Sequence, residues 1–417
     1  MNVFETTESE VRSYCRSWPV VFDRAVGAHL YDESGREYLD FFAGAGALNY
    51  GHNNPVLKQA VIDYMMADGV THSLDMNTVA KRDFLETFRD VALAPRELDY
   101  KVMFPGPAGA NAVEAALKLA RKITGRQSVI NFTNAFHGMT LGALSVTGNS
   151  MKRGGAGVPL VHATPMPYDN YLDGRVEDFL WFERLLGDSG SGLNEPAAVI
   201  VETVQGEGGI NAARPEWLRG LAELCERHGM LLIVDDVQMG CGRTGPFFSF
   251  EQAGITPDIV CLSKSIGGMG LPLALTLLRP ELDVWEPGEH NGTFRGINPA
   301  FVASTAALRE YWTDDTLEKS TLAKGEQVGR TLTDLAEEHD LKAKGRGLAR
   351  GLQFADGETA DAVCRAAFER GLLLETAGPD GEVAKLMPPL TITDDEITHG
   401  LAVFAESVRA VVGKGTA

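Results

Sequence analysis

Two side chains that could do chemistry stand just beyond two apolar runs near the middle of the chain. The run Met230–Val234 is followed by Asp235 and Gln238, and the run Asp258–Leu262 is followed by Lys264. Continuous apolar runs of this length are typical of strands that are covered on both faces of a sheet. In open α/β sheets the working site lies beyond the carboxyl ends of such strands. A carboxylate at one strand end and a lysine at the next therefore indicate a Schiff-base cofactor.

Pyridoxal phosphate (PLP) is the cofactor whose chemistry needs this pair of side chains. A carboxylate keeps the pyridine nitrogen protonated, so that the ring can accept electrons from the substrate. A partly desolvated lysine has a lowered pKa and is nucleophilic. Gln238 could reach the ring hydroxyl. Simpler interpretations stay open, since Lys264 could be a surface lysine, Asp235 a turn or cap residue and Gln238 an exposed amide.

Residues for the phosphate and for the ring face follow two other predicted strands. The turn GPAGA lies between the strand YKVMF and a predicted helix, so backbone N–H groups of Gly109, Ala110 and Asn111 could bind phosphate. The turn matches neither a Walker A loop nor GxGxxG, and it could be an ordinary strand-to-helix turn. Phe136 could stack on the ring or belong to the core. His137 could bind the cofactor or make a structural hydrogen bond.

Loop residues elsewhere are candidates for the phosphate and for substrate. Thr293 lies in the polar loop HNGTFRG and could bind phosphate. Glu207 lies in QGEGG and could gate the substrate side, and Lys385 precedes LMPP and could hold a substrate carboxylate. Asn49 and Tyr50 are substrate candidates in a glycine-rich turn, where structural roles are the alternative. Glu207 and Lys385 could also simply be solvated.

Composition excludes several other classes of function. The 417 residues are 44% hydrophobic and 23% charged, as in a globular protein, and the formal net charge of −19 argues against nucleic acid and anionic membranes. No apolar run approaches a membrane span and the first residues lack the pattern of a signal peptide. Five scattered cysteines without paired spacing indicate a reducing cytoplasm and no metal site. No HExxH or G-x-S-x-G motif is present, so metalloprotease and serine-hydrolase chemistry have no support.

The order of elements predicts an α/β fold. From about residue 100 strands and helices alternate, which favours a largely parallel sheet covered by helices. After about residue 318 the pattern changes to that of a smaller α+β part, and the N-terminal strand meander could join it. We therefore predict a large cofactor-binding domain at 51–317 and a small domain formed by 1–50 and 318–417. Residues 4–17 are predicted as one short helix and the Gly-rich residues 148–160 as a mobile loop.

Taken in order, these motifs resemble those of the class III (omega) aminotransferases of PLP fold type I. The resemblance rests on QGEGG, IVDDVQMGCGRTGPFFSFEQAGITPDIVCLSKSIGGMGLPLAL and NGTFRGINP, and it covers nearly the whole chain. It implies a large domain with a mostly parallel seven-stranded sheet and a homodimer or higher homo-oligomer with shared active sites. Within the family, segments such as NAFHGMTLGALSVTGN and KLMPPLTIT most resemble the branch that acts in ectoine biosynthesis.

The resemblance also implies roles for the candidate residues. Lys264 would carry the cofactor, Asp235 would pair with the pyridine nitrogen and Gln238 with the ring hydroxyl. Phe136 would stack on the ring, and Thr293 would reach the phosphate from the partner subunit. The chain departs from the family pattern at three places: alanines at Ala108 and Ala110 where small hydroxyl residues are usual, Asp236 where glutamate is usual, and Lys385 where arginine is common. A lysine cannot form the bidentate fork of an arginine with a carboxylate.

The activity that the resemblance implies is a ping-pong transamination. L-glutamate would give its amino group and leave as 2-oxoglutarate, and L-aspartate 4-semialdehyde would accept it to yield L-2,4-diaminobutyrate. Glutamate reacts at its α-carbon and the semialdehyde at its terminal carbon, which fits a Glu207 that can swing away from a basic residue. Alternatives are another omega-aminotransferase acting on ornithine, 4-aminobutyrate or acetylornithine, a fold type I aminomutase or epimerase, and a non-catalytic PLP-binding protein.

Overall fold

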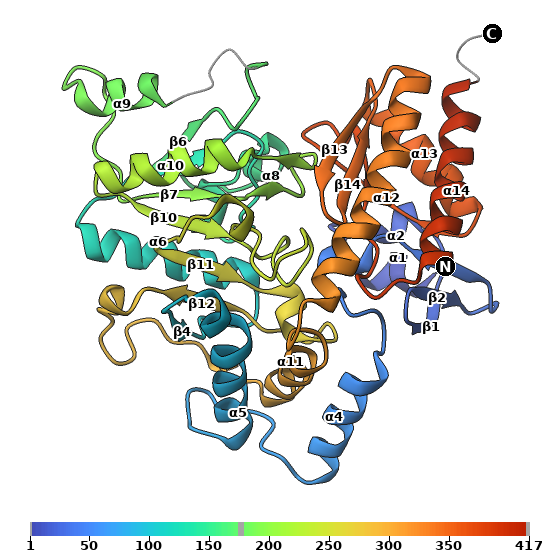
Figure 1. The fold of residues 1–417 in the computed structure, drawn as a ribbon, viewed down its shortest axis with the longest axis horizontal. Helices are drawn as coiled ribbons and strands as arrows, with labels where there is room; N and C mark the ends of the chain where they lie inside the picture. Colours follow the sequence, from blue (N-terminus) through green and yellow to red (C-terminus); the bar gives the residue numbers. More distant parts are fainter. Residues whose placement is uncertain (1, 174–178, 414–417) are drawn as a thin grey trace.

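A central seven-stranded sheet organises the chain (Figure 1), which a computed structural model describes for residues 2–173 and 179–413. The strand order is β4-β12-β11-β10-β7-β5-β6. Neighbouring strands from β11 to β6 are parallel, whereas β12 runs antiparallel to both β11 and β4. The strands are β4 (Lys101–Met103), β5 (Val129–Phe132), β6 (Ala163–Met166), β7 (Ala198–Val201), β10 (Leu231–Asp235), β11 (Ile259–Leu262) and β12 (Leu275–Leu278).

Helices cover both faces of this sheet. Successive residues of a strand point to opposite faces, so each strand contributes side chains to the packing on both sides. In β7 and β10, Val201 and Val234 pack in the same apolar cluster as Trp217 of α10 (Pro215–Arg227). The intervening Ile200 and Ile233 pack in a second cluster with the apolar face of α6 (Gly109–Thr124). Both faces are thus buried, which explains the uninterrupted apolar runs in the sequence.

The remaining helices of this part lie around the sheet (Figure 1). The helix α11 packs against both α4 and α5 beside the edge that carries β4 and β12. The helices and short strands are α3 (Ala43–Gly46), α4 (Pro55–Met66), α5 (Val79–Phe88), a π-helical turn (Arg89–Leu93), α7 (Leu141–Ser145), α8 (Ser150–Gly154), α9 (Leu180–Gly187), α11 (Asn298–Tyr311) and the hairpin of β8 (Val204–Gln205) with β9 (Asn211–Ala212).

Both ends of the chain meet in a smaller part, where the N-terminal ribbon lies beside the C-terminal helices (Figure 1). Its sheets have the orders β1-β2-β3-β15 and β13-β14-β17-β16. In the first, Leu372 and Leu373 pair with Leu39 and Asp40. The elements are α1 (Val3–Thr7), α2 (Tyr14–Ser17), β1 (Phe22–Val26), β2 (His29–Asp32), β3 (Glu37–Asp40), α12 (Thr316–His339), β13 (Lys342–Arg346), β14 (Ala349–Gln353), α13 (Gly357–Glu369), β15 (Leu372–Leu373), β16 (Glu375–Ala377), β17 (Val383–Leu386) and α14 (Asp394–Val412).

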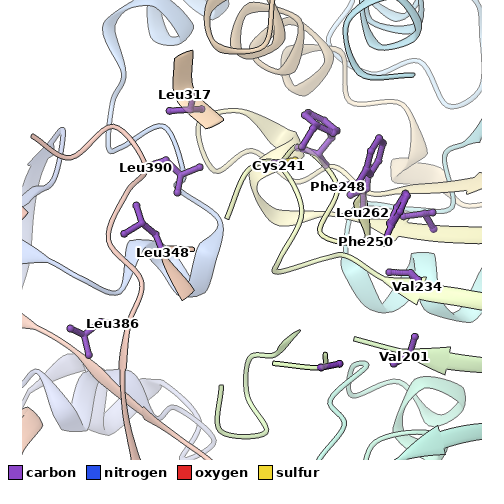
Figure 2. Close-up of a cluster of buried hydrophobic side chains, with 14 of the residues drawn as sticks. Val201, Val234, Cys241, Phe248, Phe250, Leu262, Leu317, Leu348, Leu386 and Leu390 are labelled. Carbon is purple, nitrogen blue, oxygen red and sulfur yellow. The ribbon is translucent and has the colours of Figure 1, made fainter. Parts of the chain in front are cut away.

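One apolar cluster continues from the large sheet into the smaller part (Figure 2). Val234 and Leu262 belong to the strands β10 and β11, Phe248 lies in the segment between these strands, and Leu348 and Leu390 come from the C-terminal part. Shared burial of this kind holds the two parts of the chain together. The division at residues 51 and 317 stays a prediction.

The fold class predicted from the sequence is confirmed, including the seven mostly parallel strands and the association of the N-terminal meander with the C-terminal part. Two local expectations are wrong. Residues 4–17 form two short helices, α1 and α2, rather than one. The segment 148–160 contains the helix α8, which Asn149 begins by accepting a hydrogen bond from the Lys152 N–H. Within the described part of the chain, no helix is long and apolar enough to cross a membrane.

Candidate active site

A cavity of about 210 Å³ lies beyond the carboxyl ends of β7 and β10 and beside the start of α6. Eight of the residues predicted from the sequence line it together. This agreement follows from topology, because parallel strands bring their carboxyl ends to one edge of the sheet. The eight are Gly109, Ala110, Phe136, His137, Glu207, Asp235, Gln238 and Lys264.

Lys264 begins a 3-10 turn just after β11, with Ser263 between them, and it lines the cavity. Its backbone has φ +54°, a left-handed conformation that a side chain other than glycine rarely adopts and that is common at functional sites. Nζ donates a hydrogen bond of 2.8 Å to the carbonyl of Ala45. Burial lowers the pKa of Lys264, so a larger fraction of the amine is neutral near pH 7 than for an exposed lysine.

Asp235 ends β10 and is held by two hydrogen bonds. Its Oδ2 lies 2.7 Å from Nδ1 of the fully buried His137, and its Oδ1 accepts from the Val237 N–H at 3.2 Å. Burial alone would lower the pKa of His137, but the Asp235 carboxylate raises it above the ordinary value. The histidine thus fixes the orientation of the carboxylate, so the structural alternative for His137 is the one the geometry favours.

The start of α6 supplies free backbone donors to the cavity. Its N-cap is Ala108, which has no side-chain oxygen to occupy the first N–H groups of the helix. A Cβ on Gly109 would lie 2.8 Å from the side chain of Val237, so only glycine lets this turn approach the segment after β10 so closely. Asn111 does not line the cavity; its side chain accepts from the Ala108 N–H at 3.1 Å and shapes the turn.

The residues present fit PLP. The uncapped helix start can hold a dianionic phosphate, an oriented carboxylate stands where a pyridine nitrogen would pair, and a lysine whose pKa is lowered by burial lines the same space. Phe136 forms one wall with its ring. Gln238 packs so close to the backbone of Gly206 that a Cβ there would lie 1.5 Å from its Oε1, which fixes the amide at the cavity.

On the substrate side, Lys385 lies between two carboxylates. Its Nζ, on a side chain only 1% exposed, is 2.8 Å from Oε1 of Glu207 and 2.7 Å from Oε1 of Glu375. Burial would lower the pKa of Lys385, but the two carboxylates raise it well above the ordinary value. Burial would likewise raise the pKa of Glu207, but Lys385 and Lys264 hold it well below its usual range. Glu207 also accepts a hydrogen bond of 3.2 Å from Gln238 and so joins the two groups of residues.

The remaining candidates lie outside this cavity. Asn49 is completely buried, donates to the carbonyl of Cys241 and accepts from the buried Arg243, while the hydroxyl of Tyr50 accepts from Trp312. These bonds satisfy their polar groups and favour the structural role that the sequence left open, and substrate binding by Asn49 and Tyr50 stays a prediction. Thr293 is exposed on a 3-10 turn and does not line the cavity of its own chain.

Three functional candidates were not found from the sequence. Glu202 follows β7 and lines the cavity, and burial raises its pKa to about 7. A polar residue at the end of a buried strand is the signal that identified Asp235, and it applies equally to Glu202. Glu375 interrupts the apolar segment that contains β15 and β16, but its pairing with Lys385 depends on strand register. Partial burial and the nearby charge of Glu375 raise the pKa of Tyr14, a residue that is still 45% exposed and that brings the N-terminal segment close to this ion pair.

The described residues do not form a set of metal ligands. Across 2–173 and 179–413, no group of three or more His, Cys, Asp or Glu side chains is arranged to hold a metal ion. All five cysteines are free, and four of them are buried.

Comparisons with known proteins place the chain in a family. Residues 12–408 match the model of the family described as aminotransferase class-III. The chain is 70% identical over 410 residues to a diaminobutyrate–2-oxoglutarate transaminase of Streptomyces anulatus, with 98% of each chain covered, and 60% identical to that of Halalkalibacterium halodurans, with 99% and 97% covered.

Solved structures with the same fold are further away in sequence. The ornithine aminotransferase of Toxoplasma gondii has a TM-score of 0.84 at 27% identity, covering 99% of this chain and 94% of its own, and is described with PLP at its active site. The acetylornithine aminotransferase of Elizabethkingia anophelis has a TM-score of 0.79 at 26% identity, with 98% and 97% covered.

Proposed function

The chain belongs to the class III aminotransferases, which use PLP, and we infer that it catalyses the reaction of its diaminobutyrate–2-oxoglutarate transaminase relatives. It transfers an amino group from L-glutamate to L-aspartate 4-semialdehyde, giving 2-oxoglutarate and L-2,4-diaminobutyrate, a step of ectoine biosynthesis. The single observation that carries this conclusion is 70% identity over 98% of both chains. The lysine, carboxylate and helix start around one cavity supply the physical support.

We propose roles for the residues of the cavity. PLP, when bound, supplies the electron sink that makes loss of a proton from the reacting carbon feasible. Lys264 holds the cofactor and moves this proton, for which its lowered pKa makes the amine a competent base. Asp235, oriented by His137, pairs with the pyridine nitrogen. Gly109 and Ala110 donate backbone N–H groups to the phosphate.

A second proposal concerns how two substrates use one site. Glutamate carries a carboxylate on the carbon that reacts, whereas aspartate semialdehyde and diaminobutyrate carry none there. Lys385 can bind the α-carboxylate of glutamate only when Glu207 has moved away, because Nζ is otherwise occupied. With the other substrate Glu207 stays on Lys385 and neutralises it. The 22% exposure of the Glu207 side chain gives it room to move, while the 8% exposed Glu375 stays in place.

The proposed active form is a homodimer with shared sites. Large apolar side chains are exposed on α4 and on the segment after it, and Phe294 contacts His72 of that segment with ring centroids 5.5 Å apart. An exposed apolar face of this extent favours association with a second copy, and it includes the turn that carries Thr293. The exposed apolar residues are Val56, Ile62, Met65, Met66, Val70, Leu74, Met76, Val79 and Phe294.

A cytoplasmic location is the simplest setting for this proposed enzyme. All five cysteines are free, and one of them is exposed, which suits a reducing compartment.

Competition between amino donors tests the proposed function. With 2-oxoglutarate as acceptor, kcat/KM for L-2,4-diaminobutyrate should exceed that for ornithine, acetylornithine and 4-aminobutyrate by about tenfold or more. Formation of L-glutamate is measured in parallel, because an aminomutase would release none. A preference for 4-aminobutyrate or ornithine would reject the substrate assignment while leaving the family intact.

A further inference from the structure

A second cavity, of about 390 Å³, opens beside the first and is bounded by the loop after β5, by α8 and by the turn after β16. Phe136 and Glu207 line both cavities. The second cavity therefore continues outward from the place where the reacting carbon of a substrate lies. It is large enough for the rest of a small amino acid, and its walls determine which distal groups fit.

Lys152 is the only basic side chain among the described residues that line this outer cavity. Its Nζ lies 4.2 Å from the centre of the Phe136 ring, so the ammonium contacts a residue that lines both cavities. Phe136 attracts the ammonium through its ring face and holds it without neutralising it. The side chain is half-buried, and among the described residues its ammonium has no carboxylate as an ion-pair partner.

The two acidic residues that line the outer cavity are not ion-pair partners of Lys152. Glu207 is engaged by Lys385 and Gln238, and Asp380 is exposed at the rim. A cation held over an aromatic ring and free of a permanent counter-ion is suited to bind an anion that comes and goes.

The two proposed substrates carry a carboxylate at the same number of bonds from the reacting carbon. In glutamate the distal carboxyl carbon lies three bonds from the reacting α-carbon. In aspartate semialdehyde and in diaminobutyrate the carboxyl carbon also lies three bonds from the reacting terminal carbon. One cation at a fixed place can thus serve both half-reactions, although the two molecules react at opposite ends. In ornithine and acetylornithine the corresponding separation is four bonds.

We propose that Lys152 binds the distal carboxylate of both substrates and so sets the length of substrate that the enzyme accepts. This inference rests on the proposed function. It divides the work between two lysines: Lys385 binds the carboxylate next to the reacting carbon, which glutamate alone possesses, and Lys152 binds the distal carboxylate, which both substrates possess. A one-carbon extension pushes the carboxylate past the ammonium, which disfavours ornithine.

Two matched pairs of amino donors test the proposal. L-2-aminobutyrate is glutamate without the distal carboxyl group, and 1,3-diaminopropane is diaminobutyrate without its carboxyl group. In single-turnover reactions of the holoenzyme, followed by the absorbance of the cofactor, Lys152→Met should lower kcat/KM for glutamate and for diaminobutyrate by about 10- to 100-fold, the range for a charge-assisted hydrogen bond. It should leave the two truncated donors within about threefold of wild type, because they never used the contact.

Controls keep the result interpretable. Lys152→Arg retains the charge and should keep most of the preference for both carboxylated donors, and Lys152→Gln provides a second neutral variant. Lys319→Met removes an exposed lysine that is 73% accessible and lines neither cavity, and it should change none of the four rates. Cofactor absorbance and the Tm of every variant are measured beside the rates.

Three outcomes would overturn the proposal. A neutral variant that loses rate equally on carboxylated and truncated donors assigns Lys152 a structural role. Neutral variants with unchanged preferences show that the carboxylate binds elsewhere. Loss for glutamate alone refutes the shared subsite. Turnover of diaminobutyrate by the wild-type enzyme tests the proposed function separately, so failure of the function and failure of the Lys152 subsite are distinguishable.

Discussion

The ion-pair triad at Lys385 leads to a prediction that separates the two half-reactions. Glu375 and Lys385 are direct partners across the antiparallel strands β16 and β17. The variant Glu375→Gln keeps the size of the side chain and removes its charge. Glu207 then becomes the single counter-ion of a buried ammonium, and the repulsion that Glu375 exerts on Glu207 disappears. Both changes hold Glu207 on Lys385, where it blocks the α-carboxylate of glutamate.

The size of the effect follows from the geometry. Because the two carboxylate oxygens contact the same nitrogen at 2.8 and 2.7 Å, they lie no more than about 5.5 Å apart, and Coulomb's law at an effective dielectric constant of about 20 gives about 3 kcal/mol of repulsion. The 22% exposure of Glu207 allows solvent to screen part of it. We therefore expect the loss of this repulsion to change the free-energy difference between the two positions of Glu207 by about 1–3 kcal/mol. This is equivalent to about 5- to 150-fold in the equilibrium constant between them.

Stopped-flow absorbance of the cofactor measures each half-reaction alone. For Glu375→Gln, kcat/KM with glutamate should fall by the same about 5- to 150-fold, whereas kcat/KM with diaminobutyrate should stay within about threefold, because that donor reacts with Glu207 in place. Glu358→Gln, which neutralises an exposed acid at the start of α13, serves as the matched control. Equal losses with both donors, or a faster reaction with glutamate, would refute the proposed movement of Glu207.

Three further predictions concern the cofactor site and its support. Lys264→Ala should lower amino transfer by at least about 10²- to 10⁴-fold through loss of the proton-transferring amine, and it should change the visible spectrum of bound PLP; an unchanged spectrum would contradict the role of this lysine. Asp235→Asn should lower kcat by about 10²-fold or more with PLP still bound, as measured by cofactor content beside steady-state rates. Burial raises the pKa of Asp236 from 3.8 to about 7 in spite of two hydrogen bonds from Ser249, so the stability that the neutral acid contributes is present below about pH 4 and lost as the pH rises through 7. Such a shift is worth on the order of 4 kcal/mol, and thermal unfolding at pH 5 and pH 8 should show a smaller pH effect in Asp236→Asn than in wild type.

Strand ends were readable from the sequence because their signal is local. An apolar run that stops at Asp235 or Lys264 indicates both the strand and the edge at which it ends. The same rule would have identified Glu202, which ends the segment AAVIVE. The fold class followed from this alternation of elements, and the structure confirms it with seven mostly parallel strands.

Contacts that depend on strand register or on an unusual backbone conformation could not be predicted from the sequence. The pairing of Glu375 with Lys385 requires the register of β16 on β17, which no local pattern specifies. The carbonyl of Ala45 accepts hydrogen bonds from both Lys264 and Gln238 because Ala45 has φ +55°, and nothing in the motif FFAGAGALNYG indicates that conformation for an alanine.

Polar residues in a glycine-rich turn leave their role open at the level of sequence. Asn49 and Tyr50 lie near conspicuous glycines, yet their side chains hold the core together through Arg243 and Trp312. A glycine-rich turn signals tight backbone, which is needed as often for packing as for binding. Burial of the side chain decides between a packing role and a binding role. The burial of individual turn residues is known only from the tertiary structure.

Transfer of labelled nitrogen tests the central claim most directly. The purified enzyme with PLP is given ¹⁵N-labelled L-glutamate and L-aspartate 4-semialdehyde as its only substrates, and the products are analysed by mass spectrometry and NMR. The account predicts 2-oxoglutarate together with L-2,4-diaminobutyrate that carries the label on its terminal nitrogen alone. Absence of labelled diaminobutyrate, while the same preparation transfers the label to the semialdehyde of ornithine or to that of 4-aminobutyrate, would contradict it.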